Sequence, residues 1–503
     1  MPFVLSQISP RLTVLFIIAY MLLWFAKAIG LDIRAVQGFK KLQEHQKLPW
    51  QKMFEDIENG KMRQYDQPMP AWHADNIAHL QASPSPIKTQ EIIHAVIIAS
   101  YNESREIIEP TVKAVLDSDF PMNRVILVFA YEGRNGAQSE EAVLGIIRDY
   151  GDKFMHTFAT KHPLTEGEVK GKGGNITYAG RELKKYLEQQ KIDPLNVIVT
   201  TLDSDNRPHK KYLACAAYLY AITPEPLTVS LQPIPMFTNN IWDAPAPMRV
   251  IATGNSFWMV VQGLRTHMLR NFSAHAQNMQ TLIDTDFWSV RTIVEDGHQY
   301  WRTYFRYDGQ HHVYPIFLPI YQDAVLSDTL PKTLKAQFIQ IRRWAWGASD
   351  VAYVAEKGFF TKNKAPKLDV VFKFFRLLEG HISWATAPLI LAFSSFIPLL
   401  FNNRDFAANQ LPIIASRVQT IALVGIFVTL FFSLKTLPPK PARYKRRRTF
   451  FMLIQWVYLP VTTIVYSSFA AIYSQTRLML GKYIGEFDVT DKAVVTEDRQ
   501  KIL

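Results

Sequence analysis

Apolar and polar residues are unevenly distributed along this chain. Polar and charged residues dominate the stretch from about 40 to 370, and long apolar runs lie on both sides of it. Inside the polar stretch, short apolar runs alternate with segments of helical pattern: runs at 94–100, 125–129 and 196–202, helical segments at 104–117 and 175–190. Strands that alternate with helices in this way form a mainly parallel sheet covered by helices. The pattern therefore predicts an α/β domain in the middle of the chain.

The apolar runs outside this domain predict membrane segments. The first covers 12–26 with apolar neighbours to Leu31, and runs at about 382–401 and 412–434 read as a hairpin. A membrane span needs about 20 mostly apolar residues, which these runs supply. The first run lacks a small-residue cleavage site and is followed by basic residues, which argues against a signal peptide. Only Arg11 precedes this run, whereas the following cations are Lys27, Arg34, Lys40 and Lys41. The positive-inside tendency then puts the large domain in the cytosol.

The last apolar stretch, 449–474, allows two interpretations. It is long enough to span, but Pro460 lies in its middle and would kink or break a helix. A full crossing would separate the C-terminal residues from the cytosolic domain. We favour an interfacial or re-entrant helix on the cytosolic side, and a transmembrane helix remains the alternative.

The ends of the predicted strands carry the candidate chemistry. Asp203 and Asp205 directly follow the run 196–202, and alternate residues at a strand end can face the same side. Their hard oxygens suit Mg2+ or Mn2+, which keep positions open for phosphate oxygens; a solvated turn is the alternative. Tyr101–Glu103 and Tyr131–Gly133 follow the other two strands, where α/β sheets bind ligands.

Three further groups extend this candidate site. Lys172 lies in a glycine-rich loop before a predicted helix, which suits a diphosphate or an exposed basic turn. Glu295 and Asp296 follow Thr292-Ile293-Val294. Asp296 could act as a general base while Glu295 interacts with nearby cations, or the two could be a plain acidic pair on the surface. Arg343 and Trp344 follow a predicted helical segment beginning near Lys332. The indole could stack on the apolar face of a sugar ring and the arginine could neutralise a departing diphosphate, or Trp344 could pack in a core with Trp346. The scattered histidines, including His162, His267 and His275, lack metal-ligand spacing and read as ordinary residues.

Net charge and cysteine content limit the classes of partner and site that we expect. The 503 residues carry a net charge of +12, and much of the excess lies beside apolar segments, including the basic loop 435–448. This placement favours membrane lipids over nucleic acid. A single cysteine, Cys215, excludes an internal disulfide and a cysteine-rich zinc site, and it fits a reducing cytosolic compartment.

Four motifs occur in a fixed order: Asp203-Ser204-Asp205, Val294-Glu295-Asp296, Gln340-Ile341-Arg342-Arg343-Trp344 and Phe487-Asp488-Val489-Thr490-Asp491-Lys492. Together they resemble family 2 glycosyltransferases, in particular the membrane-integrated, cellulose synthase-like processive branch, marked by D-x-D, T-E-D, Q-x-x-R-W and F-x-V-T-x-K. The resemblance covers roughly 90–350 and 475–492. It extends to Tyr101-Asn102-Glu103, Lys172-Gly173-Gly174-Asn175 and Gln232-Pro233.

The resemblance implies a role for each motif. Asp203 and Asp205 would hold the donor diphosphate through a divalent cation, and Asp296 would be the catalytic base. The acceptor and diphosphate site would comprise Gln340, Arg343 and Trp344. Tyr101, Glu103, Glu132 and Lys172 would bind the donor nucleotide. A gating loop would close over it through Phe487, Val489, Thr490 and Lys492.

Three residues depart from the family pattern. Tyr131-Glu132-Gly133 stands where the family has Asp-Asp-Gly, and the longer side chain of Glu132 leaves uridine specificity open. Val294 replaces the threonine of T-E-D.

We therefore expect an inverting membrane glycosyltransferase with a GT-A-like cytosolic domain. The resemblance implies a nucleotide-sugar donor, with UDP as the nucleotide, and Mg2+ or Mn2+ as the cation. The acceptor would be a growing polysaccharide, with export left open. A non-processive transferase acting on a lipid acceptor and a silent membrane scaffold are the alternatives, and a homo-oligomer is left open.

The expected organisation is a transmembrane helix (1–34), a linker and amphipathic segment (35–89), the transferase domain (90–350), interfacial helices (351–380), a transmembrane hairpin (381–434), the basic loop (435–448), the last apolar helix (449–481) and the gating loop with tail (482–503).

Overall fold

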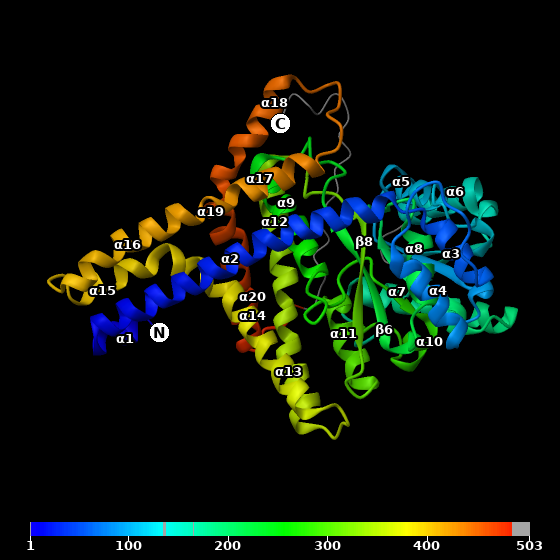
Figure 1. Cartoon of the computed structure of the whole chain (residues 1–503), viewed down its shortest axis with the longest axis horizontal. Helices are drawn as coiled ribbons and strands as arrows, with labels where there is room; N and C mark the ends of the chain where they lie inside the picture. Colours follow the sequence, from blue (N-terminus) through cyan, green and yellow to red (C-terminus); the bar gives the residue numbers. More distant parts are fainter. Residues whose placement is uncertain (1, 134–136, 164, 485–503) are drawn as a thin grey trace.

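The computed structural model describes residues 2–133, 137–163 and 165–484. Within these residues, eight strands form one sheet in the order β3-β2-β1-β4-β7-β6-β8-β5 (Figure 1). The strands are β1 (Ile93–Ser100), β2 (Val125–Glu132), β3 (His156–His162), β4 (Val197–Asp203), β5 (Arg207–Pro208), β6 (Val229–Met236), β7 (Ala276–Asn278) and β8 (His312–Tyr321).

Most of the sheet is parallel. Strand β1 lies between β2 and β4, β3 lies on the far side of β2, and all three pairings are parallel. The pair β6 and β8 is also parallel, whereas the short β7 joins β4 to β6 through antiparallel pairing. The predicted α/β class with a mainly parallel sheet is confirmed.

The three strands expected from the apolar runs are present, with one correction. We expected a turn at Tyr131–Gly133, but β2 continues through Glu132. Tyr131 pairs with Ser100 on β1 and with Lys161 on β3, so neighbouring strands on both sides hold this segment extended.

Helices cover both faces of the sheet. Alternate residues of β1 point to opposite faces, as the period of two requires: Val96 and Ile98 pack in one core, Ala95 and Ile97 in the other. The first core is closed by α3 (Trp50–Asn59), α4 (Ala71–Ala82), α5 (Arg105–Leu116), α6 (Ala137–Tyr150) and α8 (Tyr212–Ala221). The second is closed by α7 (Lys172–Gln190) and α10 (Met279–Asp284).

The remaining helices carry most of the apolar surface. They are α1 (Pro2–Ile8), α2 (Pro10–Lys47), α9 (Ala246–Gly263), α11 (Glu295–Arg306), α12 (Leu330–Ala345), α13 (Ser349–Ala355), α14 (Lys367–Phe393), α15 (Ile397–Phe401), α16 (Phe406–Ala422), α17 (Gly425–Thr436), α18 (Arg446–Ile454), α19 (Leu459–Thr462) and α20 (Phe469–Met479). Four helical stretches of the described chain are long and apolar enough to cross a membrane: Pro10–Lys47, Lys367–Phe401, Phe406–Thr436 and Arg446–Met479.

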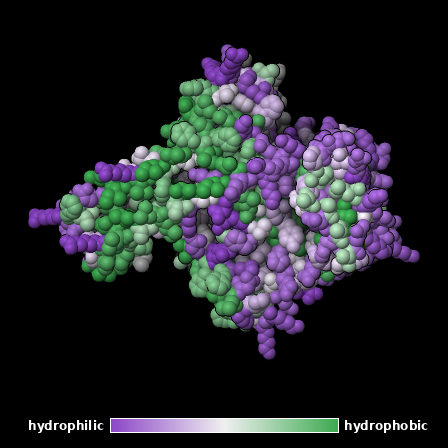
Figure 2. Space-filling model, viewed as in Figure 1, coloured by the Kyte–Doolittle hydropathy of each residue, from purple (hydrophilic) through white to green (hydrophobic). Residues whose placement is uncertain are grey.

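These four stretches are not arranged alike. Helices α1, α2, α15 and α16 project from the α/β domain as an arm with a hydrophobic surface (Figures 1 and 2). The stretch 446–479 instead contacts the domain near both ends. At its start, Arg448 donates to the carbonyl of Trp242 at 2.8 Å; near its end, the Ser474 hydroxyl donates to the carbonyl of Arg342 at 2.6 Å. This stretch therefore lies along the domain.

The basic loop before α18 also binds the domain. Asp243 accepts hydrogen bonds from Arg443 at 2.7 Å and from the hydroxyl of Tyr444. Behind them, the buried Arg249 of α9 donates to Gln455 at 2.5 Å, and burial lowers the pKa of Arg249 to about 9. Part of the charge that the sequence places in this loop thus serves internal contacts.

Candidate functional site

The carboxyl ends of β1, β2 and β4 meet at one edge of the sheet, and α7 begins beside them. The buried Asn175 in the first turn of α7 donates to the Ser100 carbonyl at 3.2 Å and to the Ala130 carbonyl at 2.8 Å. This amide joins the ends of β1 and β2 to the helix. Just beyond β1, the Glu103 carboxylate accepts the backbone N–H of Tyr101 at 2.6 Å, which orders the predicted nucleotide loop.

Lys172 and Asp203 form an ion pair at this edge. The Lys172 Nζ lies 2.7 Å from Asp203 Oδ1, and the lysine side chain is only 11% exposed. The other carboxylate oxygen of Asp203 accepts the Ser273 hydroxyl at 2.8 Å. The two residues that the sequence placed in separate loops therefore share one site, and Ser273 is a contact that the sequence gave no reason to expect.

Asp205 is held by the backbone. Its Oδ2 accepts the N–H of Asp323 at 3.0 Å, and its own carbonyl accepts the Asn239 amide at 2.9 Å. The Thr111 hydroxyl fixes the intervening carbonyl of Ser204 at 2.7 Å. The turn after β4 is therefore anchored from three directions.

Glu295 and Asp296 open helix α11 next to Lys172. Burial raises the pKa of Glu295 to about 7, reinforced by the adjacent Asp296 and opposed by Lys172. Burial also raises the pKa of Asp296, with Lys172 and Arg343 opposing and Asp203 reinforcing the shift. Burial alone would lower the pKa of Lys172, but Asp203, Glu295 and Asp296 outweigh it and raise the value. The predicted base thus lies in the same electrostatic cluster as the predicted phosphate ligands.

Close packing fixes this cluster. A Cβ added to Gly173 would lie 2.4 Å from the Ser289 carbonyl oxygen and 3.3 Å from the Glu295 Cβ. Only a residue without a side chain lets α7 approach α11 so closely. The glycine after Lys172 is required by contact rather than by flexibility.

Helix α12 brings the third predicted motif to the cluster. Arg343 acts electrostatically on Asp296, so its guanidinium belongs to the same site. Gln340 accepts a hydrogen bond from Gln337 at 3.0 Å. The half-buried Trp344 packs against Phe237, with ring centroids 6.0 Å apart. The fourth predicted motif, with Phe487, Val489, Thr490 and Lys492, lies outside the described residues.

Two further carboxylates, Glu132 and Glu168, lie around His162 near the carboxyl end of β2. His162, at the end of β3, lies with Nε2 3.0 Å from Glu168 and with Nδ1 3.9 Å from Glu132. Burial alone would lower the pKa of His162, but the two carboxylates raise it. We had read His162 as an ordinary residue; its polar strand gave no signal that it would meet Glu132.

The carboxylate oxygens at this edge are of the kind that bind a divalent cation together with phosphate oxygens. Among the described residues, no three His, Cys, Asp or Glu side chains are grouped to hold a metal. Asp203 and Asp205 nevertheless supply hard oxygens one residue apart, and Mg2+ commonly binds through one or two carboxylates plus phosphate oxygens.

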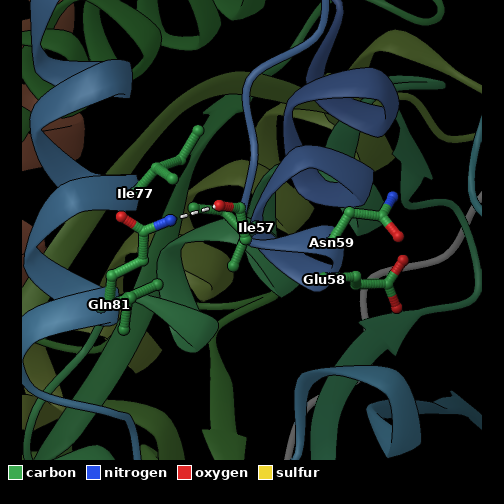
Figure 3. Close-up of a pocket in the computed structure, with 7 residues that line it drawn as sticks. Ile57, Glu58, Asn59, Ile77 and Gln81 are labelled. Atoms are coloured by element: carbon green, nitrogen blue, oxygen red, sulfur yellow. Dashed lines mark hydrogen bonds between the residues drawn. The ribbon is translucent and has the colours of Figure 1, made fainter.

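A small pocket between α3 and α4 lies elsewhere (Figure 3). Gln81 closes it by donating to the Gly60 carbonyl at 2.6 Å. Its Glu58 pairs with Arg124, which immediately precedes β2, at 2.7 Å. The pocket is therefore at the amino ends of the strands, opposite the candidate site.

Comparisons with known proteins return structural similarity alone. No protein-family model matches the chain, and no curated protein matches it. A mannosyltransferase from Pyrobaculum calidifontis, solved with GDP-Man and Mn2+, aligns over 90% of this chain and 100% of its own, at 12% identity and a TM-score of 0.42. Residues 1–349 of S. aureus TarS, solved with UDP-GlcNAc, align over 78% of this chain and 93% of their own, at 14% identity and a TM-score of 0.37. At such low scores, these similarities carry no weight in the assignment below.

Proposed function

We propose that this chain is an inverting membrane glycosyltransferase that moves a sugar from a nucleotide-sugar donor to a growing polysaccharide. The observation that carries the proposal is the convergence of Lys172, Asp203, Glu295, Asp296 and Arg343 in one electrostatic cluster. These residues come from four separate segments of the chain. Two cations for a diphosphate, a carboxylate (Asp203, with Asp205 two residues on) for a metal and a carboxyl of raised pKa are the groups that such a transfer needs.

The proposed reaction follows from these positions. The Asp296 carboxylate takes the proton of an acceptor hydroxyl as that oxygen forms a bond to the anomeric carbon of the donor sugar. The bond from this carbon to the diphosphate breaks, and its electron pair leaves with the diphosphate, which Lys172 and Arg343 hold. Because attack and departure are in line, the anomeric configuration inverts. A raised pKa suits the base, since general bases work best near the operating pH.

Asp203 and Asp205 would hold Mg2+ or Mn2+ when the donor is bound. The ion would supply Lewis-acid stabilisation of charge on the diphosphate. Asp203 stays oriented for this task by Ser273, and Asp205 by the backbone of Asp323. Glu132, backed by His162, would face the nucleobase, whose identity a donor screen would establish.

The proposed topology has three crossings and one interfacial stretch. Helices α2, α14–α15 and α16–α17 cross the membrane, and the α/β domain is cytosolic. The stretch 446–479 lies on the domain at the membrane surface, because contacts near both its ends are to that domain. The residues after α20 then start on the same side as Asp296.

A donor screen tests the proposal. Purified protein with Mn2+ or Mg2+ should transfer sugar from one nucleotide-sugar, and the size of the product would separate a polymer from a single addition to a lipid. Asp296→Asn should reduce transfer by at least about 100-fold, the usual contribution of a general base, while leaving donor affinity within about twofold. Full activity in this variant, or no transfer from any donor, would contradict the proposal.

A further inference from the structure

Outside the candidate site, a cluster of cations lies where α2 and α14 leave the α/β domain. Helix α2 packs on the end of α9 through Gly38, whose added Cβ would lie 2.5 Å from Val260 Cγ1 and 3.4 Å from Leu264 Cδ1. Arg34 lies one turn before Gly38, and Arg265 follows Leu264. This helix contact therefore brings two guanidinium groups together.

Helix α14 adds a third guanidinium. Arg376 Nη1 lies 3.5 Å from the carbonyl of His267, in the loop that follows α9. Both Arg34 and Arg376 act repulsively on Arg265 and on His267, and with burial they lower the pKa of each. Three arginines from three separate elements thus crowd one place and repel one another.

Nearby carboxylates balance only part of this charge. Glu379 attracts Arg265 and opposes the fall in its pKa, but Glu379 is itself 3.2 Å from Lys27. Among the described residues, none of the three arginines forms an ion pair with a carboxylate within 4.0 Å. Arg34 donates to the Gly30 carbonyl at 2.9 Å. A bound anion would relieve the repulsion, because each arginine retains donors for a phosphate.

The surroundings of the cluster are apolar and exposed. On α14, Leu368, Phe372 and Phe375 are exposed at helical spacing beside Arg376. On α2, Ile29 and Ile33 are exposed beside Arg34. Helix α2, which carries Arg34, runs from the α/β domain into the hydrophobic arm (Figures 1 and 2). A ligand that fits both features has an anionic phosphate head and apolar chains.

We propose that Arg34, Arg265 and Arg376 form a binding site for the phosphate headgroup of an anionic membrane phospholipid, whose acyl chains lie on the exposed apolar faces of α2 and α14. This site is separate from the proposed transfer chemistry and does not depend on it. Its role is to fix the α/β domain against anionic membrane.

Lipid titration of the full-length protein in uncharged detergent, followed by native mass spectrometry, tests this site. Phosphatidylglycerol should bind more tightly than phosphatidylcholine with the same acyl chains. The double variant Arg34→Gln with Arg376→Gln removes two exposed cations. It should bind phosphatidylglycerol about 30-fold more weakly, since one cation near an anionic lipid contributes about fivefold. A third variant, Arg265→Gln, should weaken binding about fivefold.

A matched control distinguishes a specific binding site from a general effect of net positive charge. Arg148→Gln with Arg306→Gln removes the same net charge from exposed positions of the α/β domain and should leave lipid affinity unchanged. Equal binding of the two lipids, or equal losses in the two double variants, would overturn the proposal. So would glycerol phosphate alone binding as tightly as the whole lipid, or a polyprenyl phosphate displacing phosphatidylglycerol at much lower concentration.

Discussion

Lys172 is the residue whose removal most directly tests the electrostatics of the candidate site. The change Lys172→Met keeps a long apolar stem but leaves Asp203, Glu295 and Asp296 without their shared cation. Removing one partner of a buried ion pair costs about 3–5 kcal/mol. Because the Asp203 side chain is 36% exposed, water screens part of this loss. We expect about 2 kcal/mol, or a melting temperature lower by about 2–4 °C.

The pH dependence gives the sharper signature. Lys172 opposes the rise in the pKa of both Glu295 and Asp296, so its loss should raise both pKa values further. A carboxyl whose folded pKa is raised costs stability as the pH rises from its ordinary pKa to its folded pKa. The destabilisation of the variant should therefore be largest above pH 7 and shrink as the pH falls. The acidic limb of its pH–activity profile should move to higher pH by the same amount.

Thermal unfolding in detergent between pH 5 and 9, with pH–rate profiles where activity remains, measures both effects. Lys184→Met is the matched control, since Lys184 is on the same helix in an exposed pair with Glu188. Such surface pairs contribute only about 0.3–0.5 kcal/mol. The reasoning is wrong if the two variants lose equal stability at all pH values, or if the acidic limb stays in place.

Two residues in the first turn of α7, Gly173 and Asn175, give further predictions about stability. Gly173→Ala should destabilise the protein by about 1–3 kcal/mol, because its new methyl group would meet the Ser289 carbonyl. By contrast, Gly254→Ala in α9 has open space and should be neutral or stabilising by up to about 1 kcal/mol. Equal melting temperatures for these two variants would contradict the packing argument. Asn175→Ala should cost about 1–3 kcal/mol by leaving two strand-end carbonyls without their donor, and unchanged thermal unfolding would exclude that role.

The sequence predicted those parts of the fold whose local pattern agrees with their final environment. Strands β1, β2 and β4 are continuous apolar runs, and they are buried along nearly their whole length. Strand β3 was missed because its residues, HTFATKH, are polar and half exposed at the edge of the sheet. Strand β6 was missed because Pro233 and Pro235 interrupt it, and prolines normally argue against a central strand. The structure accommodates them at a shift in the pairing register with β8.

In the candidate site, too, the sequence predicts only what has a local pattern. The motifs for Lys172, Asp203, Asp296 and Arg343 could be found separately, because each has a local signature. Their convergence, and the contacts of Asp203 with Ser273, depend on pairings between residues far apart in the sequence. The burial that raises the pKa of Glu295 likewise arises only when α7, α11 and α12 pack together.

Helix α2 bears on the distance between the sheet edge and the membrane in the proposed topology. It is one unbroken helix of 38 residues, about 57 Å long, whereas the hydrocarbon core of a bilayer is about 30 Å thick. In the proposed topology, the part of α2 outside the membrane packs against α9 at Gly38. This contact would set the distance between the α/β domain and the lipid surface. A glycan acceptor of the proposed reaction would then have to extend that distance to reach Asp296.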